Sequence, residues 1–254
     1  MIGVIDERLK AVRSLRRDDV RRLIHMAAQR LPFTVYVHQR FCWTEMDLGT
    51  APVLPLPEGL VLTSAGVDDL GALRELGAWF ERSRDWLDAG HELWLVRDGE
   101  RPVGSFWVFH GMAPTDSAPH GWVSMPDGMI NIEDTVTDPE YRGRGIAPAM
   151  YSQVYDRQKR SGRAEMVIGG VPEANHANRR AVAKSGWREF ALVDVKKYGL
   201  IRRGRDWRNR EDPGGRFVRT RLSVGPVEHP DPEAAGALRA WLEAALRAET
   251  PAPR

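Results

Sequence analysis

Apolar positions along the chain follow two patterns: short runs rich in β-branched and aromatic residues, and longer stretches with helical spacing. The short runs predict strands within residues 33–37, 40–43, 60–63, 92–96, 103–109, 129–137, 167–171, 190–195 and 198–201. Apolar residues three and four positions apart predict helices within residues 20–31, 70–80, 146–154, 177–184 and 232–245. We therefore expect a domain in which strands and helices are interleaved.

Turn and cap residues divide these elements. Asp98-Gly99, between two predicted strands, is a strong hairpin signal. Residues 111–128 are rich in Gly, Pro and Ser and predict a long loop of the kind that often serves function. Helix starts are indicated by aspartates that can accept a hydrogen bond from the first turn: Asp18 or Asp19, Asp68, and Asp231 followed by Pro232.

Composition narrows the class of protein. The chain has 254 residues, 42% apolar and 28% charged, which suits one well-packed domain with appendages or two small domains. Cys42 is the only cysteine, so the sequence excludes an internal disulfide and a multi-cysteine metal site. A net charge of +2 is too small to indicate nucleic-acid binding. With no secretory signal and no apolar run long enough to span a bilayer, we expect a cytoplasmic protein.

The most informative motif follows the strand predicted at residues 129–137. Thr135-Val136-Thr137-Asp138-Pro139 leads through Glu140-Tyr141 into Arg142-Gly143-Arg144-Gly145-Ile146-Ala147, where a helix begins. Glycines at a strand-to-helix junction let consecutive N–H groups point outward, and the helix dipole adds positive charge, so the turn can bind an anion such as a pyrophosphate. Arg142 and Arg144 add charge-assisted donors. The spacing matches neither of the common glycine-rich nucleotide loops.

The segment Arg142–Ala147 resembles the coenzyme A pyrophosphate loop of the GNAT superfamily of N-acyltransferases, bacterial small-molecule type. A second element has the right order and separation, because the strand at 167–171 is followed by Asn175, a helix, and Gly186-Trp187. The resemblance covers roughly residues 60–203. It implies an α/β GNAT fold, with a central mixed sheet flanked by helices. We predict an N-terminal extension at 1–56, the acyltransferase domain at 57–204, and an Arg-rich segment with a helix at 205–254.

The resemblance also implies a reaction and a binding site. Acetyl-CoA or another acyl-CoA would be the co-substrate, no metal would be needed, and an amine would attack the thioester directly, without a covalent intermediate on Cys42. A main-chain N–H near Val136 could bind the thioester oxygen. The residues implied to bind coenzyme A are Val136, Thr137, Arg142, Gly143, Arg144, Gly145, Ile146, Ala147 and Asn175.

The residues that handle protons are harder to assign. Glu133 and Asp134 lie on the central strand, where their side chains should point to opposite faces, and either could take the proton of the amine. The competing interpretation is a structural ion pair or a strand exposed on one face. Many members of the superfamily carry a Tyr seven residues after the Asn, and this position is Val182 here. Either another group protonates the departing thiolate or it leaves unprotonated.

Several alternatives stay open. The finer similarity favours a small-molecule amine, such as an amino sugar or another metabolite, over a peptide acceptor. The protein could instead bind acyl-CoA without turnover, or use a longer acyl group or an acyl carrier protein as donor. Arginines between Arg202 and Arg221 could bind nucleic acid or anionic lipid, although interspersed acids dilute this charge and such runs are usually solvated. A homodimer also remains open.

Overall fold

An eight-stranded mixed sheet forms the centre of the molecule, in the order β10-β9-β1-β8-β7-β4-β3-β2. The computed structural model describes residues 33–78, 82–119, 121–202 and 219–248, without the side chains of residues 33–35 and 200–202. The sheet strands are β1 (Phe33–Asp47), β2 (Leu60–Ala65), β3 (Glu92–Asp98), β4 (Arg101–His110), β7 (Met129–Thr137), β8 (Met166–Pro172), β9 (Arg188–Arg202) and β10 (Arg219–Gly225). Among these strands only β7 and β8 pair in parallel.

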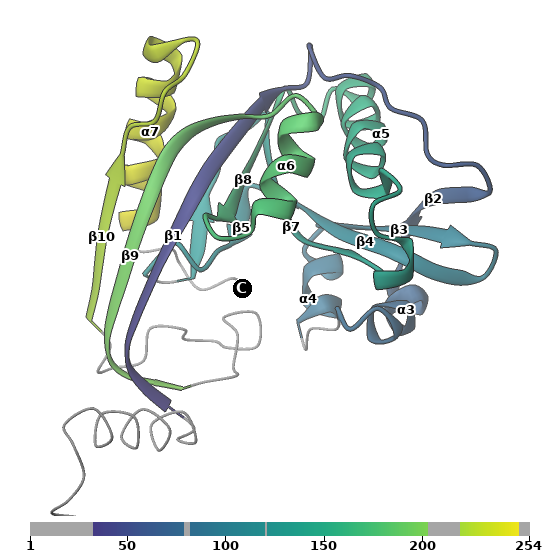
Figure 1. Ribbon diagram of the computed structural model, residues 1–254, viewed down its shortest axis with the longest axis horizontal. Coiled ribbons are helices and arrows are strands. Elements are labelled where there is room, and N and C mark those ends of the chain that lie inside the picture. The colour runs from purple at the N-terminus through teal and green to yellow at the C-terminus, as the bar shows by residue number, and fades with distance from the viewer. Residues whose placement is uncertain (1–32, 79–81, 120, 203–218, 249–254) are drawn as a thin grey trace, which may run out of the picture.

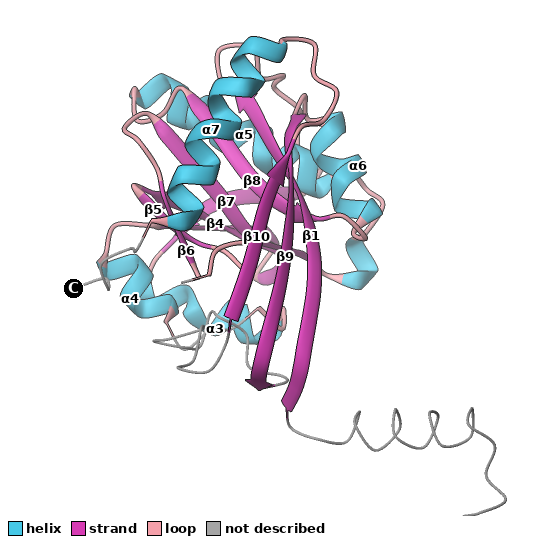
Figure 2. Cartoon of the chain, turned by 90° about the vertical axis from the view of Figure 1, so that its left-hand side faces the viewer, coloured by secondary structure: helices cyan, strands magenta, loops and turns pink. Residues whose placement is uncertain are grey.

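Helices cover both faces of the sheet (Figures 1 and 2). One face carries α5 (Ile146–Ser161) and α6 (His176–Lys184). The other carries α3 (Leu70–Glu75), α4 (Ser83–Asp88), α7 (Pro232–Arg247) and a small hairpin of β5 (Met112–Pro114) and β6 (Trp122–Ser124). Short 3-10 turns, η1 (Val67–Asp69) and η2 (Pro139–Tyr141), precede α3 and α5. Each face therefore has its own apolar core, and the sheet separates the two.

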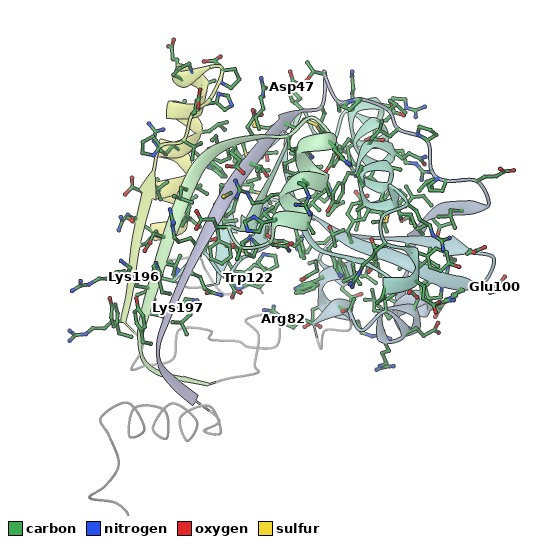
Figure 3. All side chains as sticks on the ribbon, viewed as in Figure 1. Asp47, Arg82, Glu100, Trp122, Lys196 and Lys197 are labelled. Carbon is green, nitrogen blue, oxygen red and sulfur yellow. The ribbon has the colours of Figure 1, made fainter. Side chains whose placement is uncertain are left out.

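The predicted interleaved α/β architecture with a central mixed sheet is confirmed, but two pairs of predicted strands are each one long strand. Residues 33–47 form a single strand, and so do residues 188–202. The first of these, β1, lies between β9 and β8 inside the sheet. The predicted boundary at residue 56 therefore does not separate an extension from the sheet. Figure 3 shows the width of the sheet, with Lys196 and Lys197 of β9 on one side and Glu100, beyond β3, on the other.

Local signals predicted the turns and caps in part. A two-residue connection after Asp98 joins β3 to β4, and the Asp231 side chain accepts a hydrogen bond from Ala234 at the start of α7. Asp68 caps no helix; instead the carboxylate of Asp69 accepts from the N–H of Gly66. The predicted long loop contains the β5–β6 hairpin. The helix predicted at residues 20–31 and residues 203–218 of the arginine-rich segment lie outside the described residues.

Neither a membrane-spanning helix nor a metal-binding cluster is found in the part of the chain that the structure describes. It contains no helix long and apolar enough to cross a membrane. It also contains no group of three or more His, Cys, Asp or Glu side chains placed to hold a metal ion.

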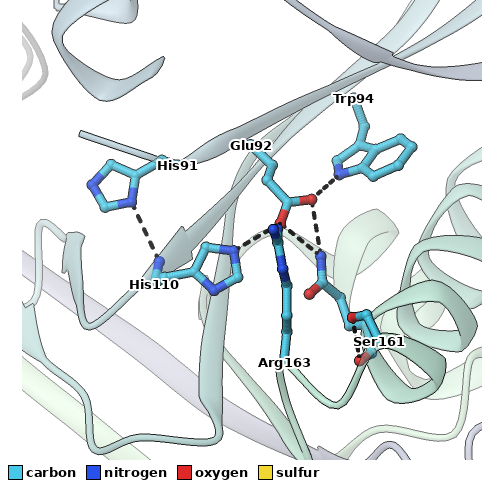
Figure 4. Close-up of polar contacts among 7 residues, drawn as sticks. His91, Glu92, Trp94, His110, Ser161 and Arg163 are labelled. Carbon is cyan, nitrogen blue, oxygen red and sulfur yellow. Dashed lines mark hydrogen bonds and ion pairs between the residues drawn. The ribbon is translucent and has the colours of Figure 1, made fainter. Parts of the chain in front are cut away.

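A partly buried carboxylate, that of Glu92, joins β3, β4 and α5 (Figure 4). Glu92 accepts hydrogen bonds from His110 at 3.0 Å, from Trp94 at 3.0 Å and from Gln158 at 2.9 and 3.0 Å. Arg163 adds an ion pair at 3.0 Å. Burial alone would raise the pKa of Glu92, but the hydrogen bonds from His110 and Gln158 lower it to about 2. The carboxylate therefore remains charged and joins the end of α5 to the sheet.

His91, next to this carboxylate, is held neutral. Its Nδ1 accepts a hydrogen bond from the main-chain N–H of His110, and its ring lies 4.8 Å from that of Phe109. Burial, with a smaller contribution from the charge of His110, lowers the pKa of His91 to about 4. Protonating His91 would thus oppose folding.

We expect acid to destabilise the fold in two steps. The unfolded chain protonates His91 near pH 6.5 and the folded chain only near pH 4, so stability falls across this interval by at most about 1.4 kcal/mol per pH unit. Glu92 adds a loss between about pH 4.5 and pH 2. Urea unfolding across this range measures both. His91→Asn keeps an acceptor for His110 but does not titrate, and should remove the first step only; an unchanged slope above pH 4 would contradict this assignment.

Candidate active site at the split between β7 and β8

The two parallel strands pair only where they begin. Met129, Ile130 and Asn131 of β7 pair with residues 166–168 of β8, and no pairing follows. Beyond this point β7 continues to Thr137 and β8 to Pro172. Beyond this point, main-chain N–H and C=O groups on the facing edges of the two strands do not pair with each other. Because such groups need hydrogen-bond partners when buried, they are available to a ligand.

A bulge in β7 lies at the start of this split. Glu133 pairs with Trp107 of β4, and Val136 pairs with Ser105, so Asp134 and Thr135 together face one residue of β4. Asp134 has a φ of 54°, the only positive φ outside glycine among the described residues. The extra residue reverses the alternation of side chains.

The consequence is visible in the packing on the two faces. Ile132 packs with α5 and α6, and strict alternation would place Val136 there as well. Instead Val136 packs into the opposite core, and Thr135 turns to Tyr151 of α5. The bulge therefore presents Thr135 to the helices that border the split.

A cavity of about 680 Å³ opens at the wide end of the split. It is lined by the end of β7, by the first turn of α5 with the loop before it, and by one face of α6. Its lining residues are Thr135, Val136, Thr137, Tyr141, Arg142, Gly143, Gly145, Ile146, Ala147, Pro148, Asn175, Ala177, Asn178, Arg180, Ala181 and Lys184. The loop that ends at Ala147 and Asn175, 28 positions further along the chain, were both predicted to bind coenzyme A and thus meet at one cavity.

The glycines of the loop before α5 make an open cradle. Gly143 and Gly145 have φ values of 78° and 79°, the left-handed region that favours glycine, and nothing lies within 4 Å of where a Cβ would stand. Among the described residues, none accepts a hydrogen bond from the five consecutive N–H groups of residues 143–147. Pro148 follows, and it has no N–H to satisfy. The loop therefore offers free donors and a helix N-terminus to an anion.

The two loop arginines are placed differently. Arg142 lines the cavity, and its Nε donates to the main-chain oxygen of Thr137 at 3.1 Å. Arg144 stacks on Tyr141 at 4.6 Å, donates to the oxygen of Glu140 and is not among the residues that line the cavity. Only the main chain of Arg144 therefore remains available to a ligand in this cavity.

Two cations on α6 were missed by the sequence analysis. Arg180 and Lys184 line the cavity one helical turn apart, together with Ala177 and Ala181 of the same helix. The spacing was visible in the sequence, as was the start of the helix at Asn175. The side-chain oxygen of Asn175 accepts from the N–H of Asn178 at 3.1 Å, so it caps α6 while lining the cavity. The cavity is thus bordered by positive charge on two sides.

A second, small cavity of about 50 Å³ lies at the narrow end of the split. Thr135 and Asn178 line both cavities, so the small one continues the large one inward. Both candidate bases, Glu133 and Asp134, line it. Its full lining is Thr44, Ile132, Glu133, Asp134, Thr135, Tyr151, Gly169, Gly170, Val171, Asn178, Val182 and Trp187. A long ligand in the large cavity would therefore end beside two carboxylates.

One comparison with known proteins identifies a family for part of the chain. Residues 67–187 match the model of the Acetyltransferase (GNAT) family. A search of the curated proteins found no match. Among solved structures, the chain is similar to a GCN5-related N-acetyltransferase from Kribbella flavida, with 16% identity, a TM-score of 0.47 and coverage of 67% of this chain and 61% of that chain. It is also similar to a GCN5-related N-acetyltransferase from Sphaerobacter thermophilus, with 18% identity, a TM-score of 0.48 and coverage of 76% of this chain and 59% of that chain. The match thus spans about three fifths of either solved chain.

Proposed function

We propose that the protein transfers an acyl group from acyl-coenzyme A to a primary amine of a small molecule, because residues 67–187 match the model of the Acetyltransferase (GNAT) family. The observation that carries the proposal is the row of free main-chain N–H groups at residues 143–147, at the mouth of a cavity of about 680 Å³. These donors, the open glycine cradle and the positive end of α5 fit a diphosphate. Acyl-CoA supplies the activated thioester.

The rest of the donor would lie along the split. Arg142, Arg180 and Lys184 border the cavity and would neutralise the phosphates. The unpaired edge of β7 at Val136 and Thr137 offers main-chain groups to the amide-containing arm. The thioester would then reach Thr135, where the large cavity meets the small one. A small cavity of about 50 Å³ has room for an acyl group of two or three carbons, which supports an acetyl donor.

We assign the general base to Glu133. Its register partner on β4, Trp107, belongs to the core on the face away from α5 and α6, so an amine could approach from that face while the donor lies on the other. We assign Asp134 a structural role instead, because aspartate tolerates the left-handed backbone conformation that the bulge needs. Holding amine and thioester on opposite sides of one strand orders the two reactants for direct attack.

Donor binding is tested by a charge placed in the cradle. Gly145→Glu should weaken binding of coenzyme A by at least about a hundredfold, equivalent to about 2.8 kcal/mol, because the side chain and its charge occupy the anion site. Calorimetry measures the affinity.

Gly162→Glu is the matched control for this variant. Gly162 ends the same helix with a φ of 67° and open space around its Cβ position, so both variants carry similar backbone strain. Its affinity for coenzyme A should match that of the wild type. Equal affinities in the two variants would refute the site assignment, and no binding by the wild-type protein would refute the proposed function.

The assignment of the base is tested by two isosteric changes. Glu133→Gln should lower kcat by about a hundredfold or more and remove the acidic limb of the pH–rate profile, because the base is lost. Asp134→Asn should keep most activity, since asparagine also adopts the left-handed conformation. Thiol release from acetyl-CoA with a panel of amines gives both rates. The opposite ranking would transfer the role to Asp134.

A further inference from the structure

A buried tyrosine, Tyr151, is hydrogen-bonded to the hydroxyl of Thr135, which lies where the two cavities meet. Tyr151 of α5 is 2% exposed, and its phenol oxygen lies 2.8 Å from Oγ1 of Thr135. Thr135 lines both cavities, and Tyr151 lines the small one. The contact exists only because the bulge turns Thr135 toward α5. The arrangement therefore fixes a polar group at the point where a thioester would lie.

The direction of this hydrogen bond follows from acidity. A phenol is a far stronger acid than an aliphatic alcohol, so Tyr151 donates and Thr135 accepts. The O–H of Thr135 is then left to donate elsewhere, and no acceptor for it is found in the described part of the chain. Accepting one hydrogen bond also polarises a hydroxyl and strengthens the one that it donates. The O–H of Thr135 is thus available to a ligand in the cavities that Thr135 lines.

Tyr151 itself is unsuited to give up its proton. Burial, and to a smaller extent the charge of Glu133, raises the pKa of Tyr151 to about 12. A free thiol has a pKa of about 8.5, so a thiolate is a base more than a thousandfold too weak to take this proton. The phenol therefore stays protonated during turnover and acts through Thr135.

We propose that the Thr135 hydroxyl, oriented by Tyr151, donates a hydrogen bond to the thioester carbonyl oxygen and stabilises the negative charge that builds there. Thr135 is then a catalytic residue and Tyr151 a positioning residue. The proposal rests on the proposed function and deepens it, because it assigns a side-chain donor to the oxygen. No proton is transferred in this step.

Steady-state kinetics test whether Thr135 and Tyr151 act through the same hydroxyl. Thr135→Val, which keeps the shape of the side chain, should lower kcat by about 100- to 1,000-fold, the range for loss of one such donor, with the KM for acetyl-CoA changed little. Tyr151→Phe should lower kcat by about tenfold. In the Thr135→Val background, Tyr151→Phe should cause no further loss, because both act through one hydroxyl. Thr135→Ser should keep most of the activity.

A spectroscopic measurement tests the contact without any acceptor. Infrared spectra of acetyl-CoA labelled with ¹³C at the carbonyl, bound to the protein, report the hydrogen bond as a lowered C=O stretching frequency. The frequency should rise in Thr135→Val and, by a smaller amount, in Tyr151→Phe. A merely structural role for either residue would leave it unchanged.

Tyr155→Phe is the matched control. Tyr155 stacks on Tyr151 one turn further along α5, is fully buried and lines neither cavity. Its variant should keep both kcat and the carbonyl frequency. Equal losses in Tyr155→Phe and Tyr151→Phe, independent effects of the Thr135 and Tyr151 variants, or an unchanged frequency in Thr135→Val would overturn the proposal. Wild-type protein that binds no coenzyme A would overturn the proposed function and this proposal together.

Discussion

The early end of pairing between β7 and β8 is the constraint on which the site depends. Parallel strands in a sheet normally continue their ladder, because a buried N–H or C=O without a partner costs about 1–3 kcal/mol. Here the ladder ends at Asn131, and the chain beyond it faces cavities instead. A ligand with amide groups can supply the missing partners. The unpaired edge is thus the main-chain counterpart of the free N–H groups at residues 143–147.

The bulge at Asp134 gives the same strand two different faces along its length. Before it, Ile130 and Ile132 pack against α5 and α6; after it, Thr135 takes that face and Val136 takes the other. A regular strand would have pointed an apolar valine at the donor cavity. One residue in the left-handed region, at a cost of about 1–2 kcal/mol, instead brings a hydroxyl there. The strain is therefore located where the chemistry would take place.

The sequence predicted those parts of the site that depend on local chain geometry. Gly143 and Gly145 indicated the cradle because a tight turn before a helix favours glycine. Asn175 indicated the start of α6 through the resemblance to the GNAT superfamily, and its side chain does cap the helix. The bulge was not predicted, since no turn residue announces it and it arises from pairing with β4. Glu133 and Asp134 were accordingly expected as neighbours in a regular strand, whereas Asp134 lies in the bulge and both residues line the small cavity. The position of β1 inside the sheet also depends on long-range pairing, and the alternation of side chains along one strand does not indicate which strands it pairs with.

The position of β1 explains how the split stays open. β8 pairs with β1 along the whole of Phe41–Asp47, and β1 pairs with β9 over most of its length, whereas β8 meets β7 at three positions. The sheet therefore consists of two blocks, β10-β9-β1-β8 and β7-β4-β3-β2, joined by a short parallel ladder. The first block fixes β8, so β8 cannot close onto β7 without breaking its longer ladder. Since the family match begins at residue 67, the strand that holds the site open lies outside the matched segment.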